Sequence, residues 1–139
     1  MPFLKLRENA TPGIYQPHLF DEAERKQIQH QIANYIKQLS KEKLDKGPEA
    51  MRVTMADDMV IIKSEHYLTR MEQFIIQNPH GVETVRSARS DAIAGVVRDG
   101  DVLDFLEKVT QAKPIYTLYE SYPEDDYCIW VFMFDRRLV

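Results

Sequence analysis

The stretch from Lys46 to Glu72 constrains the fold most, because it holds a turn, two strands and a helix start with almost no spare residues between them. Gly47 and Pro48 predict the turn, since Gly permits positive φ and Pro removes a backbone donor and fixes φ. Residues 51–55 alternate apolar and polar side chains, as in a strand with one buried face. Residues 59–62 form an apolar run that predicts a central strand covered on both faces.

Two capping signals predict where helices begin. Thr69 with Glu72, and Asp21 with Glu24, match the capping box, in which the two side chains satisfy amides that a helix start leaves unpaired. Apolar residues at spacings of three and four after Asp21 predict an amphipathic helix of about 20 residues. We expect the short helix that starts at Thr69 to carry its apolar residues inward, namely Met71, Phe74 and Ile75.

A second apolar stripe runs from Val82 to Val109, and its period drifts near Gly100. An interior Gly costs a helix about 1 kcal/mol relative to Ala. The stripe therefore predicts either one long helix with a bend or two helices, with Asp101 as the cap of the second.

Two further strands, 114–122 and 127–134, flank a turn at residues 123–126. The order helix, hairpin, one or more helices, hairpin predicts an α+β fold, in which one four-stranded antiparallel sheet is covered by amphipathic helices. We expect a single domain at residues 20–139. Residues 1–19 hold three prolines and show no period, which predicts an extended N-terminal arm that is mobile or packs on the domain. The apolar residues available for that packing are Phe3, Leu4, Leu6, Ile14 and Tyr15.

The charge and cysteine content exclude several classes of protein. A net charge of −4 argues against nucleic acid as the main ligand, since phosphate binding needs a clustered basic surface. Cys128 is the single cysteine, so no internal disulfide can form, and this fits a reducing cytoplasm. We find no apolar leader and no run of about 20 apolar residues, so we expect no direct membrane insertion. Stability requires no cofactor.

The last hairpin is unusually rich in aromatic residues, which leaves more apolar surface than one covered face easily hides. We therefore expect a homodimer, with Tyr119, Trp130 and Phe132 as candidate interface residues.

The candidate ligand-binding residues are Arg52, Arg86 and Arg89. Arg86 and Arg89 lie three residues apart on one helix face, and the sheet could bring Arg52 to them, where the guanidinium groups would hold an anion. Salt bridges to nearby carboxylates are the alternative role. Gly47, Pro48, Thr69 and Glu72 are interpreted as structural residues.

The histidines, Ser64 and Cys128 give weaker indications of a functional site. The four histidines are far apart and lack metal-ligand spacing, so no metal site is predicted. Ser64, Glu65 and His66 are adjacent, but neighbours on a strand point to opposite faces, which argues against a catalytic triad. Cys128 is expected to be a small buried hydrophobe. No catalytic residue is predicted, and we expect a protein that is not an enzyme.

The sequence from Lys46 to Arg89 resembles the MpsC-like family, named after component C of a sodium-translocating, membrane-potential-generating system. The resemblance rests on the order and spacing of short elements, and Arg70 and Met71 stand where the family usually has Pro-Ala, which keeps the capping chemistry. The matching residues are Lys46-Gly47-Pro48-Glu49, Arg52, Asp58-Met59, Leu68-Thr69, Glu72, Gly81 and Arg89. The resemblance extends over about residues 21–135 and does not include the N-terminal arm.

The resemblance implies a cytosolic accessory or regulatory protein, linked in some bacteria to sodium or bicarbonate transport. Our first hypothesis is therefore a non-enzymatic protein that acts through protein–protein contacts, with a membrane transporter component as a possible partner. The alternatives are a small-anion or nucleotide sensor that uses the arginine cluster, and an RNA-binding module that uses the aromatic hairpin.

Overall fold

The computed structural model describes residues 3–6 and 18–139, so the predicted packing of Ile14 and Tyr15 lies outside the described residues. The fold is α+β, as predicted, but its antiparallel sheet has five strands rather than four, in the order β1-β4-β5-β3-β2. The additional strand, β1 (Phe3–Lys5), pairs with the outer edge of β4 (Pro114–Tyr122). Three residues are too few to show an alternating pattern, which explains why the sequence did not reveal it.

The remaining elements follow the chain in a simple order. Helix α1 spans Glu22–Leu44 and is followed by β2 (Ala50–Ala56) and β3 (Met59–Glu65). Helices α2 (Arg70–Ile75), α3 (Pro79–Asp99) and α4 (Asp101–Thr110) come next. Strand β4 then leads through a short 3-10 helix, η1 (Pro123–Asp125), to β5 (Tyr127–Phe134).

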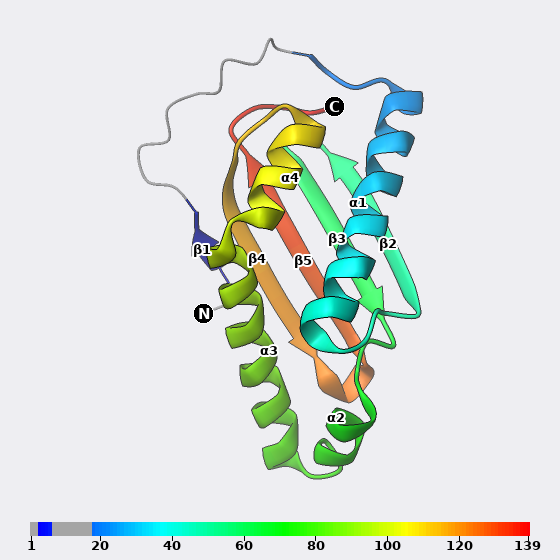
Figure 1. Ribbon diagram of the computed structural model, residues 1–139, viewed down its shortest axis with the longest axis vertical. Coiled ribbons are helices and arrows are strands. Elements are labelled where there is room, and N and C mark those ends of the chain that lie inside the picture. Colours follow the sequence, from blue (N-terminus) through cyan, green and yellow to red (C-terminus); the bar gives the residue numbers. More distant parts are fainter. Residues whose placement is uncertain (1–2, 7–17) are drawn as a thin grey trace.

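The helices and the sheet form two layers. Helices α1, α3 and α4 lie on the same face of the sheet, and α2 lies at one end of the molecule beside the start of α3 (Figure 1). Strand β5 is the middle strand, and its Trp130, Phe132 and Phe134 are buried beneath the helices. Ile32, Ile36 and Leu106 complete this core from the helical side.

The opposite face of the sheet is only half-buried. Met59 and Ile61 point to that face and remain partly accessible, so the expectation that residues 59–62 are covered on both faces is wrong for the described part of the chain. The apolar run reflects a strand whose second face is apolar but has no described helix over it.

Both predicted capping boxes are present. The Asp21 carboxylate accepts from the Glu24 N–H and the Glu24 carboxylate accepts from the Asp21 N–H, while Thr69 and Glu72 make the same exchange at α2. Met71 and Phe74, by contrast, do not point inward, because their side chains are 69% and 70% exposed. A helix of six residues cannot bury a full stripe, and only Ile75 packs on the core.

Gly100 separates α3 from α4 and takes the left-handed conformation, with φ 86°, that favours glycine. The two-helix alternative is therefore the one that the structure adopts. Asp101 is not the cap, since it is the first helical residue of α4 and the N-cap position belongs to Gly100.

Gly81 allows α2 and α3 to approach closely. It is buried in the first turn of α3, and a Cβ atom there would lie 1.7 Å from the carbonyl oxygen of Ile75. Because the obstructing atom belongs to the backbone, no side-chain rotation relieves the overlap. The sequence therefore needs glycine at this position.

We predict that Gly81→Ala lowers the free energy of unfolding by about 3 kcal/mol, since the α2–α3 turn must shift to admit the methyl group. Gly95→Ala is the matched control on the same helix, because its Cβ would meet only an Arg98 nitrogen at 3.8 Å. Ala is the better helix former there, so this variant should gain about 0.5–1 kcal/mol. Urea denaturation of both variants checks the prediction, and equal stabilities would contradict it.

Candidate functional site

Residues 66–69, which connect β3 to α2, form a loop on which several distant parts of the chain converge. The Asp126 carboxylate, from the turn before β5, accepts hydrogen bonds from the Tyr67 and Leu68 N–H groups at 2.9 and 3.0 Å. The Asp126 carbonyl also accepts from the His66 N–H at 2.9 Å. His66 and Asp126 both have positive φ, so the two turns hold each other in uncommon backbone conformations.

The turn after α1 is attached to the same loop. The Lys46 ammonium donates to the Leu68 carbonyl at 3.1 Å, and the Glu49 N–H donates to the His66 carbonyl at 3.3 Å. The 46–48 turn that the sequence predicts therefore rests against the 66–69 loop, and Pro48 lines a small cavity behind it.

Arg89 of α3 provides the third attachment. Its side chain is almost fully buried, and its Nε donates to Glu72 Oε2 at 2.7 Å while Nη2 donates to Glu72 Oε1. Nη2 also donates to the Tyr67 carbonyl at 3.3 Å, and the guanidinium lies 4.9 Å from the centre of the Tyr67 ring. Because Glu72 also accepts from the Thr69 N–H, one carboxylate caps α2 and neutralises Arg89.

The pair shifts the ionisation of both groups. Burial acts to raise the pKa of Glu72, but the hydrogen bonds from Arg89 and Thr69 and the charge of Arg89 outweigh it, so the pKa is lowered. Burial acts to lower the pKa of Arg89, and Glu72 more than compensates, so that pKa is raised. Both groups are held in their charged forms at neutral pH.

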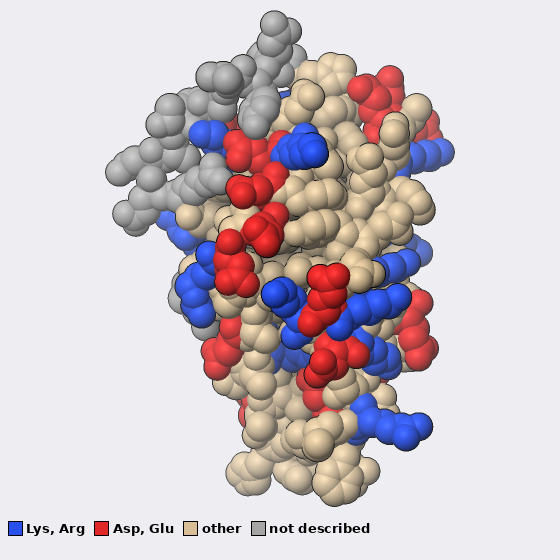
Figure 2. Space-filling model, viewed as in Figure 1, with Lys and Arg blue, Asp and Glu red and all other residues tan. Residues whose placement is uncertain are grey.

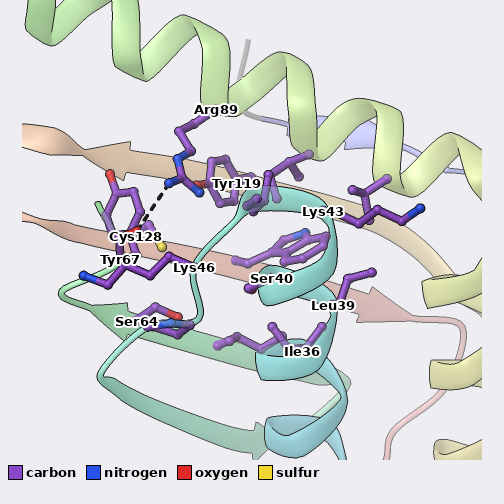
Figure 3. Close-up of a pocket in the computed structure, with 16 residues that line it drawn as sticks. Ile36, Leu39, Ser40, Lys43, Lys46, Ser64, Tyr67, Arg89, Tyr119 and Cys128 are labelled. Carbon is purple, nitrogen blue, oxygen red and sulfur yellow. Dashed lines mark hydrogen bonds between the residues drawn. The ribbon is translucent and has the colours of Figure 1, made fainter. Parts of the chain in front are cut away.

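The cavity behind the loop is enclosed by α1, α3 and the middle strands, with Arg89, Tyr67, Ser64 and Cys128 at one end and Leu39 and Ile36 at the other (Figure 3). Its volume is about 40 Å³. That is room for a few water molecules at most, whereas small-molecule pockets measure about 300–1,000 Å³.

Two hydroxyl groups near the polar end of the cavity, Tyr67 Oη and Ser121 Oγ, are buried and have no hydrogen-bond partner among the residues that the structure describes. Burial raises the pKa of Tyr67, and the nearby Ser121 hydroxyl and Arg89 charge offset the rise only in part. Burial also raises the pKa of the Cys128 thiol to about 11, against hydrogen bonds with Tyr119 and Ser64. The thiol is therefore protonated at neutral pH and is a poor nucleophile.

The three arginines predicted to bind an anion do not meet at one site. Arg52 is exposed on β2, and its position in the strand places it on the face opposite the buried Val53 and Met55. Arg86 pairs with Glu83 and Glu124 and donates to the Ser121 carbonyl at 3.1 Å. Since Arg89 is paired with Glu72, the salt bridges weighed as the alternative are present at both α3 positions.

The aromatic residues predicted for an interface lie in the core of the chain. Tyr119, Trp130 and Phe132 are buried beneath the helices, and the Trp130 Nε1 donates to Thr117 Oγ1 at 2.7 Å. Their rings are therefore not on the surface, where a partner or an RNA base could stack on them. Ser64 points to the same covered face, whereas Glu65 is exposed on the other.

Sequence reasoning missed Asp126, which holds the 66–69 loop from 58 residues away in the chain. The available signal was the turn composition Pro-Glu-Asp-Asp before β5, because Asp tolerates positive φ and bonds to nearby backbone amides. That signal predicts a turn but not which distant amides the carboxylate would reach.

Within residues 3–6 and 18–139, no three His, Cys, Asp or Glu side chains gather as a metal site would require. None of the helices described in these ranges is both long enough and apolar enough to cross a bilayer.

Comparison with known proteins gives one family and one curated relative. The model of the family described as "Na+-translocating membrane potential-generating system (MpsC)" matches residues 24–136. The uncharacterized protein YrhF of Bacillus subtilis (strain 168) is 28% identical over 109 residues, which cover 78% of this chain and 88% of that protein. No solved structure matches the chain. The matched residues begin within the first turn of α1 and continue through β5, so they contain the whole environment of the 66–69 loop.

We predict that Glu72→Gln lowers the free energy of unfolding by about 3 kcal/mol at neutral pH, because it leaves the buried Arg89 charge uncompensated. Arg89→Met should cost less, since Glu72 is closer to solvent and retains its bonds to Thr69. The double variant should lose less unfolding free energy than the two single variants lose together, by at least about 1 kcal/mol. Urea denaturation of all four proteins measures this coupling, and additive losses would contradict a direct pair.

The lowered pKa of Glu72 predicts a pH dependence. A carboxylate with a lowered pKa in the folded state adds stability above its unfolded pKa, about 4.3, and loses it as the pH falls through the folded value. The stability gap between the natural protein and Glu72→Gln should therefore shrink as the pH falls from 7 towards 3. Asp91→Asn, which changes an exposed carboxylate on α3, is the control and should show no such convergence.

Proposed function

Because the chain belongs to the MpsC family, we propose that it is a non-enzymatic accessory protein of a Na+-translocating, membrane-potential-generating system and acts by contacting another protein of that system. The observation that carries the proposal is the family match over residues 24–136. The arrangement of the 66–69 loop supports a structural rather than a chemical role, since Arg89 is paired with Glu72, and Asp126 and Lys46 bond to the backbone of the loop.

Helix α2 is the surface that we assign to the partner protein. Met71 and Phe74 stand side by side on its exposed face, and both are about 70% exposed. Large apolar side chains that are close together and this accessible are typical of protein-binding surfaces. Helix α2 lies at the lower tip of the molecule, and the lowest part of that tip shows no Lys, Arg, Asp or Glu (Figure 2), so the contact would be largely uncharged.

The 66–69 loop supports this assignment because it fixes α2 in place. A six-residue helix is unstable alone. Here its first turn is held by Thr69, Glu72 and Arg89, and the loop before it is held by Asp126 and Lys46. Met71 and Phe74 are thus presented on a rigid element, which lowers the entropy cost of binding.

We further propose that the protein works in the cytoplasm and reaches the membrane through its partner. Cys128 is a free, buried thiol in the described fold, which suits a compartment where disulfides are rare.

We predict that the double variant Met71→Ser/Phe74→Ser abolishes partner binding without unfolding the protein, because both side chains are exposed. The tagged full-length chain would be expressed in place of the native copy, and its partners would be recovered from gently solubilised membranes and identified by mass spectrometry. The natural chain should retain a sodium-transport component, and the double variant should lose at least about tenfold of it. Leu19→Ser, which removes an exposed apolar residue elsewhere, is the matched control and should retain it.

The same strains test the function itself. Sodium-dependent membrane potential, measured with a voltage-sensitive dye in everted vesicles, should fall when the gene is deleted and return with the natural chain or Leu19→Ser but not with the α2 variant. A potential that does not depend on the gene would refute the proposed function. A potential restored by the α2 variant would refute only the assigned contact surface.

A further inference from the structure

The second face of the sheet is apolar at its centre and has no described helix over it. Helices α1, α3 and α4 all lie on the other face (Figure 1). Strand register arranges its side chains in rows that cross β4, β5 and β3. One row is Leu118, Val131 and Ile61, and the next is Tyr116, Met133 and Met59. All six residues are only half-buried, so the chain leaves a continuous apolar area accessible.

A third row gives this face a charge pattern. It consists of Glu120 on β4, Ile129 on β5, Lys63 on β3 and Arg52 on β2. Glu120 and Lys63 are two strand spacings apart, about 9.6 Å, with Ile129 between them. Neither makes an ion pair with another residue that the structure describes. The face thus carries an acidic group on one side of β5 and, at the same height on the other side, the two basic groups of Lys63 and Arg52.

We propose that this face binds a second copy of the chain, with a two-fold axis that runs parallel to β5 between the two sheets. Such a rotation exchanges the two sides of β5 and keeps the height along the strand. Lys63 then faces Glu120 of the partner subunit, and Ile61 faces Leu118 of the partner subunit. Val131, Ile129 and Met133 face their own counterparts across the axis.

Other orientations of the axis fit the rows poorly. An axis perpendicular to the strands, through the Leu118–Val131–Ile61 row, reverses the height and places the charged row against Tyr116, Met133 and Met59. That arrangement would bury the charges of Lys63 and Glu120 without partners, which is strongly unfavourable. A two-fold axis normal to the sheet would join the two sheets edge to edge and leave the apolar face of each accessible. Of these three axes, the one along β5 matches apolar rows with apolar rows and pairs Lys63 with Glu120.

The geometry is that of a common sheet sandwich. Two sheets that pack with their strands nearly aligned lie about 10 Å apart and cross at about 30° because each is twisted. Over the three central strands, a crossing angle of about 30° displaces facing residues by only a few ångströms. The long side chains of Lys63 and Glu120 can span that displacement. The homodimer expected from the aromatic content is thus assigned to a different surface from Tyr119, Trp130 and Phe132.

The test is a charge exchange on the full-length chain, read by sedimentation velocity. The natural protein should be a dimer at micromolar concentration. Lys63→Glu brings like charges together at two symmetric places, as does Glu120→Lys, so each variant alone should dimerise at least tenfold more weakly. Mixed in equal amounts, the two variants should form a heterodimer of natural affinity, because both facing pairs then have opposite charges.

Lys108→Glu, which makes the same charge change on α4, is the matched control and should dimerise normally. Circular dichroism would verify that each variant is folded. A natural protein that is monomeric throughout the micromolar range overturns the proposal, as do charge variants that dimerise normally. Variants that weaken the dimer but do not rescue each other overturn the axis along β5. None of these substitutions touches α2, so failure here is distinct from failure of the partner contact.

Discussion

The buried ion pair between Arg89 and Glu72 is the interaction on which the rest of the site depends. Arg89 is a charged side chain in the core, and it is stable there because Glu72 and the Tyr67 carbonyl accept its hydrogen bonds. Glu72 is available only because Thr69 fixes it in the first turn of α2. Helix α2, the 66–69 loop and the middle of α3 therefore form one unit, and the position of the exposed α2 side chains follows from a charge that the chain could not leave unpaired.

Contacts between residues that are close together in the chain could be predicted from the sequence. The capping boxes at Asp21 and Thr69 were recognised because both partners lie within one helical turn. The sequence does not predict that Glu72 is a counter-ion or that Asp126 is an acceptor, because each contact joins residues that are distant in the chain. The three arginines do not gather at one site, for a related reason. Spacing on α3 places Arg86 and Arg89 together and alternation places Arg52 opposite Val53, but only the fold shows that α3 covers the other face of the sheet (Figure 1).

The two proposed contact surfaces are separate parts of the molecule. The dimer would use the open face of the sheet, whereas the partner contact would use α2 at the end of the molecule. Pairing two copies through their sheets would leave both α2 helices accessible, so a dimer could hold two partner sites at once. Bivalent attachment raises the effective affinity without adding any contact to the individual site.

Strand β1 has an importance that its three residues do not suggest. By pairing with β4 it occupies the outer edge of the sheet, and the Leu6 N–H adds one further bond to Ile115. An unpaired edge of this kind is a template on which other extended chains can assemble. Removal of the first six residues would therefore expose this edge and take Leu6 away from the core, so the resistance of the folded protein to aggregation would depend on a very short segment.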